Sequence, residues 1–291
     1  MNNSTTSFNY CNNSSYKNTL GKIALVSIFM TLPLFTFAKD FPLASVTDHT
    51  KGDGFAQSIG INLEYSPVFD GSDEYGIEFQ VAGAIQFRKG NHLFFLEGFN
   101  IDGLELGWRS MVTNNYFLQL GIRHETVLPK MDLTDGKIVG IPHRGSTVFG
   151  FAEGTYFFDK NELFWMTGRF SAGPSDFGYR AKVSVGHSFI RSYNGLGLDL
   201  VAYSTFGDKE QFDRYFGISA DESLSSGLAQ SDLDGGYRSS GLEVFYRQNI
   251  FTSIQILARV GVELYSDEIE ESALVSDNSE LTSGFAVMWR F

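Results

Sequence analysis

The chain has 291 residues and a formal net charge of −12, and its length fits one large β-domain or two small domains. The acidic balance argues against nucleic acid as a partner, because phosphate binding requires a basic surface. Aromatic residues make up 15% of the chain, and only 6 residues are proline. Aromatic-rich usage favours strands, and no apolar run after residue 38 is long enough for a membrane helix.

The N-terminal segment has the organisation of a secretory signal peptide. Residues 1–22 are polar, with two lysines as the only charges, and residues 23–38 form an apolar run that ends on the small residue Ala38. We therefore expect a cleaved signal peptide over residues 1–38 and a mature domain over residues 39–291.

Twelve segments of the mature chain show the alternation of apolar and polar residues that is typical of strands. In one of them, Ile254, Ile256 and Val260 share one face, while Arg259 and Glu263 share the other. The twelve candidate strands are residues 56–65, 76–87, 92–97, 101–112, 114–124, 147–158, 163–172, 178–188, 196–206, 237–248, 252–265 and 281–291. Ten or fourteen strands are the alternatives.

The last candidate strand helps to decide between a soluble and a membrane β-protein. It alternates with a period of two and carries Trp289 and Phe291 at its end. Soluble domains usually fray at their ends, whereas a strand that closes a membrane barrel must pair throughout, because an unpaired edge in lipid is prohibitive. Together with the signal peptide, this predicts an all-β fold, a closed antiparallel transmembrane β-barrel of about 12 strands. The expected location is the cell outer membrane, and a soluble periplasmic β-protein is the alternative.

The lengths of the connections give an independent indication. With the C-terminus placed in the periplasm, the connections on that side are all short: 88–91, 113, 159–162, 189–195 and 249–251. The opposite side then holds every long loop: 66–75, 98–100, 125–146, 173–177, 207–236 and 266–280. Outer-membrane barrels show the same asymmetry between periplasmic turns and outer loops.

Fixed charges of both signs lie on the polar faces of the candidate strands. The expected inward-facing set is Glu105, Arg109, Arg123, Glu153, Arg169, Arg180, Lys182, Asp199, Glu243, Arg247, Arg259, Glu263 and Arg290. We expect cross-strand salt bridges between them to fill a small lumen. The alternative is a polar path for a small solute, because twelve strands lie between the filled eight-stranded barrels and the wide porins.

No motif for catalysis or metal binding stands out. Cys11, the single cysteine, precedes the apolar run, so the mature domain lacks thiols and disulfides. The five histidines show no metal-ligand spacing, and the adjacent His187 and Ser188 would point to opposite faces of a strand. We expect no cofactor, no metal and no enzymatic activity. We expect the acidic side chains of the outer loops to be solvated. The expected partners of the barrel are outer-membrane lipid and lipopolysaccharide.

Three segments carry a family resemblance. Residues 66–75 read SPVFDGSDEY, with a core of Pro67, Phe69, Gly71, Ser72, Asp73 and Tyr75. Residues 214–228 read RYFGISADESLSSGL and begin a YFG-type motif at Tyr215, Phe216 and Gly217. The third is the loop ESALVSDNSE followed by the closing strand, where Ala273, Leu274 and Val275 replace a frequent Ser-Pro. In order and spacing these segments resemble the MipA/OmpV family, the MltA-interacting proteins of the Gram-negative outer membrane.

The resemblance implies a non-enzymatic scaffold that bridges a lytic murein transglycosylase and a murein-synthesising penicillin-binding protein. From the residues themselves, we expect Gly71 to serve a tight turn and Asp73 to accept backbone N–H bonds there. Tyr215 and Phe216 would be costly in an exposed loop, so we expect them to fold against the barrel mouth or into the lumen. A narrow porin or small-solute-binding channel is the second hypothesis, and an outer-membrane enzyme such as a lipase is the third.

Overall fold

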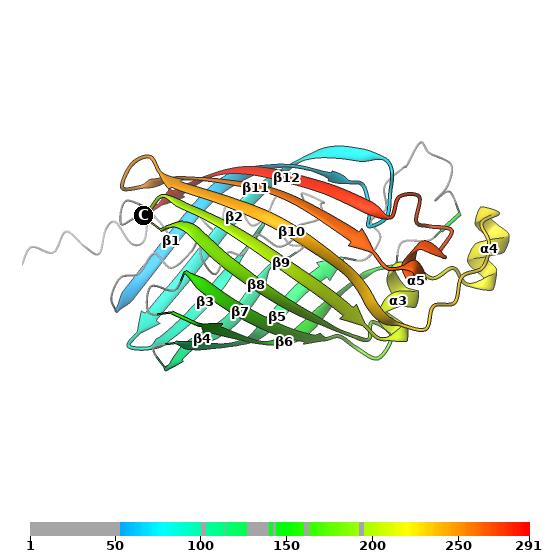
Figure 1. Cartoon of the computed structure of the whole chain (residues 1–291), viewed down its shortest axis with the longest axis horizontal. Helices are drawn as coiled ribbons and strands as arrows, with labels where there is room; N and C mark the ends of the chain where they lie inside the picture. Colours follow the sequence, from blue (N-terminus) through cyan, green and yellow to red (C-terminus); the bar gives the residue numbers. More distant parts are fainter. Residues whose placement is uncertain are drawn as a thin grey trace, which may run out of the picture. The chain divides into compact units, whose positions relative to one another are not determined.

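The computed structural model shows a closed antiparallel barrel of twelve strands (Figure 1). The described strands and loops of the barrel belong to one compact unit. The structure describes residues 53–99, 103–113, 115–126, 140–141, 144–159, 163–191 and 195–291. The expected signal peptide over residues 1–38 lies outside the described residues.

Each strand pairs with its neighbours in sequence, and the last strand pairs with the first. The strands are β1 (Gly54–Pro67), β2 (Tyr75–Lys89), β3 (His92–Phe99), β4 (Glu105–Thr113), β5 (Tyr116–Thr126), β6 (Ser146–Phe157), β7 (Phe164–Ala172), β8 (Tyr179–Arg191), β9 (Gly197–Gly207), β10 (Gly236–Asn249), β11 (Ile254–Tyr265) and β12 (Ser279–Arg290). Each of the twelve candidate segments corresponds to one of these strands. The predicted fold class and the strand count of twelve are therefore confirmed.

Strand β12 shows how the alternation divides the two faces of the barrel wall. Phe285 and Trp289 are 46% and 55% exposed on the outside, while Ala286 and Met288 are buried in the lumen. The chain stays paired to its end, because the N–H of Phe291 donates to the carbonyl of Gln57 at 3.0 Å. No backbone edge is therefore left open where β1 meets β12.

Apolar side chains cover the outside of the barrel. Every strand exposes at least one large apolar residue: Ile61, Phe79, Phe94, Leu106, Ile122, Val148, Phe170, Val183, Phe206, Leu242, Val262 and Phe285. Soluble proteins rarely expose such a continuous apolar surface, and a lipid-facing belt accounts for it. None of the helices in the described part of the chain has both the length and the apolar character to cross a bilayer.

The two ends of the barrel differ in their connections. One end, here the short-turn end, has the connections 90–91, 114–115, 158–163, 192–196 and 250–253. The other, the long-loop end, has 68–74, 100–104, 127–145, 173–178, 208–235 and 266–278. This confirms the predicted alternation of short and long connections. Placing the short turns in the periplasm stays a prediction.

In the described part of the chain, three short helices lie at the long-loop end, opposite the C-terminus (Figure 1). They are α3 (Lys209–Tyr215), α4 (Ala220–Ser226) and α5 (Asp267–Glu270). Their N-caps are Asp208, Ser219 and Ser266, whose side-chain oxygens accept backbone N–H bonds of the first turn. The sequence analysis expected only loops here, because helices of one or two turns leave almost no apolar period to detect.

Candidate functional site

One ion-pair network lies on the wall of β1, β12, β11 and β10, with its side chains supplied by β1, β10 and β11. The guanidinium of Arg259 is buried and lies 2.7 Å from a carboxylate oxygen of Glu64 and 3.7 Å from one of Glu243. Glu64 itself is buried. A buried charge is tolerated only when it is paired, so these three side chains depend on one another.

A second network lies on the facing wall, where β5, β7 and β8 supply arginines. Arg169 lies 2.7 Å from Glu105 and 3.6 Å from Glu153, and Arg123 lies 3.3 Å from Glu105. The guanidinium of Arg169 also stacks over Phe151, 3.9 Å from the ring centroid. Farther toward the long loops, Arg180 donates two hydrogen bonds to Glu125. The predicted cross-strand salt bridges are confirmed for Glu105, Arg123, Glu153, Arg169, Glu243 and Arg259. Arg109 and Arg180 pair instead with Glu97 and Glu125, which the prediction did not include.

An apolar cluster fills another part of the lumen. It consists of Ala82, Val201, Phe245, Leu257, Ala286 and Met288, with Trp165 packed against it. It lies toward the short-turn end, since Met288 is two residues before the last residue of β12 and Leu257 is three after the first of β11. The sequence analysis did not foresee this cluster, because it assigned the inner faces to charges.

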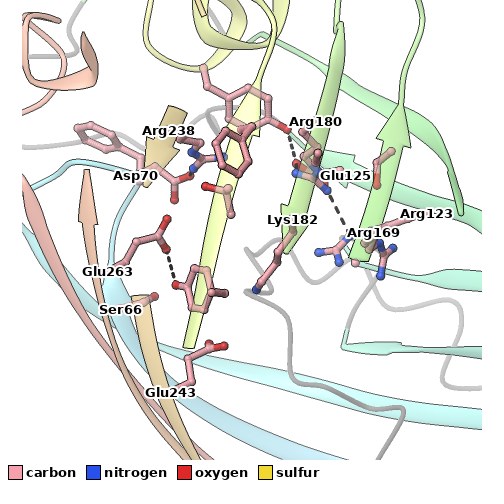
Figure 2. A pocket seen from close by; sticks show the side chains of 18 of the residues that line it. Ser66, Asp70, Arg123, Glu125, Arg169, Arg180, Lys182, Arg238, Glu243 and Glu263 are labelled. Carbon is pink, nitrogen blue, oxygen red and sulfur yellow. Dashed lines mark hydrogen bonds and ion pairs between the residues drawn. The ribbon is translucent and has the colours of Figure 1, made fainter. Parts of the chain in front are cut away.

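Between the two walls lies a cavity of about 180 Å³ in the long-loop half of the lumen (Figure 2). Its position follows from its lining, which includes the last residues of β1 and the first residues of β8. The charged and hydroxyl side chains of the lining are Glu64, Ser66, Asp70, Arg123, Glu125, Thr126, Arg169, Ser171, Arg180, Lys182, Tyr203, Thr205, Tyr215, Arg238, Glu243 and Glu263.

Lys182 differs from the other cations of this lining. Its ammonium lies 3.9 Å from the ring centroid of Tyr203. Within the residues that the structure describes, it makes no hydrogen bond and no ion pair. Its direct cross-strand partner is Arg169, another cation. Like charges placed directly opposite destabilise a sheet, and the carboxylates that act electrostatically on Lys182 are those of Glu243 and Glu263.

The segment 208–235 reaches the cavity through Tyr215, which is part of the lining. The hydroxyl of Tyr215 donates to Glu125, and Arg238 pairs with Asp70. Burial, together with the negative charge of Glu125, raises the pKa of Tyr215 well above its ordinary value, so this hydroxyl stays protonated and keeps donating. Phe216 is buried in a cluster with Phe212, Leu233, Tyr265 and Ile269. This confirms the expected packing of Tyr215 and Phe216 against the barrel mouth.

The motif residues of segment 66–75 lie around the seam between β1 and β12. Gly71 has a φ of 87°, its N–H donates to Glu280 at 2.6 Å, and its carbonyl accepts from Ser276 at 2.7 Å. The hydroxyl of Tyr75 accepts the N–H of Leu281 at 3.1 Å. The loops 68–74 and 266–278 are thereby joined across the seam.

The remaining motif residues have different surroundings. The hydroxyl of Ser72 accepts the N–H of Glu74 at 3.0 Å, and the predicted capping role of Asp73 stays a prediction. Pro67 ends β1 and lines the cavity. The carbonyl of Gly217 accepts a hydrogen bond from Arg144. The three segments of the motif therefore meet at the long-loop end, whereas Trp289 and Phe291 lie at the opposite end.

Among the described residues, no group of three His, Cys, Asp or Glu side chains is arranged to hold a metal ion. His187 packs edge-on against Phe189, with ring centroids 4.8 Å apart. Ser188 faces the lumen instead and donates to Asp199. The two side chains do not form a dyad, and this is the geometry that the strand period predicts.

Comparison with known proteins identifies one family. The model of the family described as "MltA-interacting protein MipA" matches residues 59–291. No curated protein matches the chain.

Among solved structures, the chain is similar to a bacterial polysaccharide outer-membrane secretin, with 13% identity, a TM-score of 0.46, and coverage of 81% of this chain and 98% of that one. It is also similar to the Ralstonia pickettii toluene transporter TbuX, with 10% identity, a TM-score of 0.42, and coverage of 86% and 93%. An outer-membrane channel from Pseudomonas putida F1 shares 10% identity with a TM-score of 0.46, over 84% and 98% of the two chains.

Proposed function

The chain belongs to the MipA family, and from this premise we propose that this outer-membrane barrel is a non-enzymatic scaffold for murein enzymes. The family description names an interaction with MltA. We take the partner to be a lytic murein transglycosylase, with a murein-synthesising penicillin-binding protein as the second enzyme that the scaffold brings close. Both enzymes would meet the barrel on its periplasmic side.

The observation that carries the proposal is the filled lumen. The ion pairs of Arg259, the guanidinium groups around Glu105 and the apolar cluster around Leu257 all occupy the space that a wide channel keeps open. A wide porin leaves an aqueous path through its lumen. A barrel that fills its interior offers its two rims for function, and this favours a scaffold over a channel.

The short turns supply a candidate contact surface. Phe251 is 64% exposed in the turn 250–253, next to Ile250 at 42%. An exposed aromatic residue at a turn adds little to the stability of the barrel, and aromatic side chains are enriched in protein interfaces. In the predicted topology this turn faces the periplasm, where the transglycosylase works.

Capture of purified transglycosylase by the refolded barrel tests the proposal. We expect the wild-type barrel to retain the enzyme and Phe251→Ser to weaken the retention at least tenfold. The matched control is Leu224→Ser, because Leu224 is 86% exposed on α4 at the opposite end, and we expect it to bind like the wild type. Loss of capture in the Leu224 variant alone would reverse the predicted topology.

Conductance in planar bilayers separates the scaffold from the channel. We expect the wild-type barrel to show no stable conductance steps. Reproducible steps that disappear when the protein is omitted would contradict the scaffold hypothesis and favour a narrow porin. Retention of a penicillin-binding protein only when transglycosylase is also present would support the bridging role.

A further inference from the structure

The charges that line the cavity balance one another. The lining contains five carboxylates and five cationic side chains. Arg180 pairs with Glu125 and Arg238 with Asp70, and the carboxylates that act on Lys182 come from β10 and β11. A ligand with a net charge would disturb this balance inside the barrel, where an uncompensated charge is costly. The cavity therefore suits a neutral molecule.

Four side chains of the lining have hydrogen-bonding capacity that the described protein groups do not use. They are Ser66 on β1, Ser171 on β7, Lys182 on β8 and Glu243 on β10. Among the residues whose structure is described, none of these four side chains makes a hydrogen bond. The carboxylate of Glu243 lies 3.7 Å from the guanidinium of Arg259, which is beyond hydrogen-bond distance. Charge is thus balanced in the cavity, whereas hydrogen bonding is not.

These four side chains surround one space. Ser66 and Ser171 are both buried, and their strands, β1 and β7, are on opposite sides of the ring of twelve. Lys182 and Glu243 lie on the two strands that flank β9. Figure 2 shows Ser66, Lys182 and Glu243 reaching toward the same space. An ammonium only donates, a carboxylate only accepts, and a hydroxyl does both, so an occupant meets donors and acceptors on several sides.

We propose that this cavity binds a small neutral polyol, a molecule with a hydroxyl group on each carbon. Its hydroxyl groups would accept from the ammonium of Lys182, donate to the carboxylate of Glu243, and bond to the two serine hydroxyls. Buried polar groups are normally hydrogen-bonded to protein or water, so ordered waters are the competing occupants. Each ordered water loses entropy, and one polyol replaces several of them.

The size of the cavity sets the size of the polyol. An apolar protein cavity of about 150 Å³ is large enough to bind benzene, and this cavity measures about 180 Å³. It therefore suits a molecule slightly larger than benzene, and erythritol is an appropriate probe. The matched controls are 1,4-butanediol, which has the same carbon chain without the inner hydroxyl groups, and erythronate, which carries a carboxylate. They separate the contribution of the hydroxyl groups from that of charge.

The experiment is an NMR titration of the refolded mature barrel in micelles of a detergent without a sugar headgroup, because a sugar headgroup is itself a polyol. We expect erythritol to bind about tenfold more tightly than 1,4-butanediol, since two hydrogen-bonding groups are lost, and more tightly than erythronate. The double variant Ser66→Ala, Ser171→Ala should weaken erythritol binding by about the same factor.

The matched control variant is Ser58→Ala. Ser58 lies on β1, like Ser66, and its buried hydroxyl also makes no hydrogen bond within the described residues. It is not part of the cavity lining, so Ser58→Ala should bind erythritol like the wild type. A mobility shift between boiled and unboiled samples shows that each variant has formed a closed barrel.

Three results would overturn the proposal. Absence of erythritol binding would leave water as the occupant, equal binding of 1,4-butanediol would remove the role of the hydroxyl groups, and undiminished binding by the double serine variant would place the site elsewhere. Tighter binding of erythronate than of erythritol would likewise contradict a neutral ligand. The site is independent of the scaffold role, because the double serine variant should still capture transglycosylase. Failure of one hypothesis is thus distinguishable from failure of the other.

Discussion

The charged and the apolar parts of the lumen meet on one strand. Arg259 and Leu257 are consecutive inward-facing positions of β11, and both are buried. Arg259 is held by carboxylates from β1 and β10, whereas Leu257 packs among apolar side chains such as Phe245 and Met288. The inner face of β11 thus carries two kinds of lumen filling, one ion-paired and one apolar.

The two kinds of filling respond differently to change. An apolar cluster needs complementary shape and loses stability in proportion to the space that is emptied. An ion-pair network needs each partner, because removing one leaves an uncompensated buried charge. The cavity lies in the charged part of the lumen.

Removing Arg259 should give the largest effect. Arg259→Met leaves Glu64 buried without this guanidinium, and we expect a loss of about 4 kcal/mol in the free energy of unfolding. Urea unfolding in lipid vesicles measures it. The double variant Arg259→Met, Glu64→Gln should recover part of the loss, because the buried charge is gone. A double variant as unstable as the single one would contradict the assignment of the cost to an unpaired charge.

Truncation of Leu257 should lower the free energy of unfolding somewhat less than the removal of Arg259. Leu257→Ala empties a fully buried position of the apolar cluster, and we expect a loss of about 3 kcal/mol. The same unfolding measurement applies. The volume-conserving control Leu257→Met should cost less than about 1.5 kcal/mol. If Leu257→Ala and Leu257→Met lowered the free energy of unfolding equally, the apolar cluster would not be closely packed around Leu257.

The packing of the segment 208–235 should be weakened by Arg144→Gln. The guanidinium of Arg144 is buried and donates to the carbonyls of Asp213, Arg214 and Gly217 at 2.5–3.1 Å. Asp213 and Arg214 belong to the last turn of α3, and Gly217 lies just beyond its end, where a cation is favourable. We expect a local loss of about 2 kcal/mol, seen as faster amide exchange over residues 208–235. The exposed Glu210→Gln should change this exchange little, and global loss of protection would contradict a local role.

The smallest expected effect is a pH dependence at α4. Burial opposes ionisation of Glu222, but hydrogen bonds from Ser219 and the charge of Arg144 outweigh it and lower the pKa of Glu222 below its ordinary value. The contribution to stability is therefore present above the ordinary carboxyl range and is lost as the pH falls through the lowered pKa. Amide exchange of α4, compared between about pH 6 and about pH 3, should reveal the loss. Glu222→Gln should remove this dependence, and an unchanged pH profile would refute it.

The sequence predicted the strands well because a strand in this wall has a period of two, with lipid on one side. The charged residues on the predicted inner faces also indicated salt bridges, because a charge such as that of Arg169 inside a barrel is stable only when it is paired. The apolar cluster could not be foreseen, because Leu257 and Met288 lie on faces that otherwise carry polar groups. The cavity depends on side chains from β1, β8 and β10, whose proximity exists only after closure. The caps Asp208 and Ser219 were the available signals for the missed helices.

The contacts of Gly71 have a consequence for how the barrel is assembled. Strands β1 and β12 come from opposite ends of the domain, so their pairing closes the longest loop and carries the largest entropic cost. A slip of one residue in this last pairing would turn every side chain of the strand to the wrong face. Gly71 bonds to Ser276 and Glu280 just above the seam, and a Cβ there would lie 2.9 Å from a methyl group of Val275. These contacts exist only in the correct alignment of β1 with β12, so they help to fix the register of the closing strand pair.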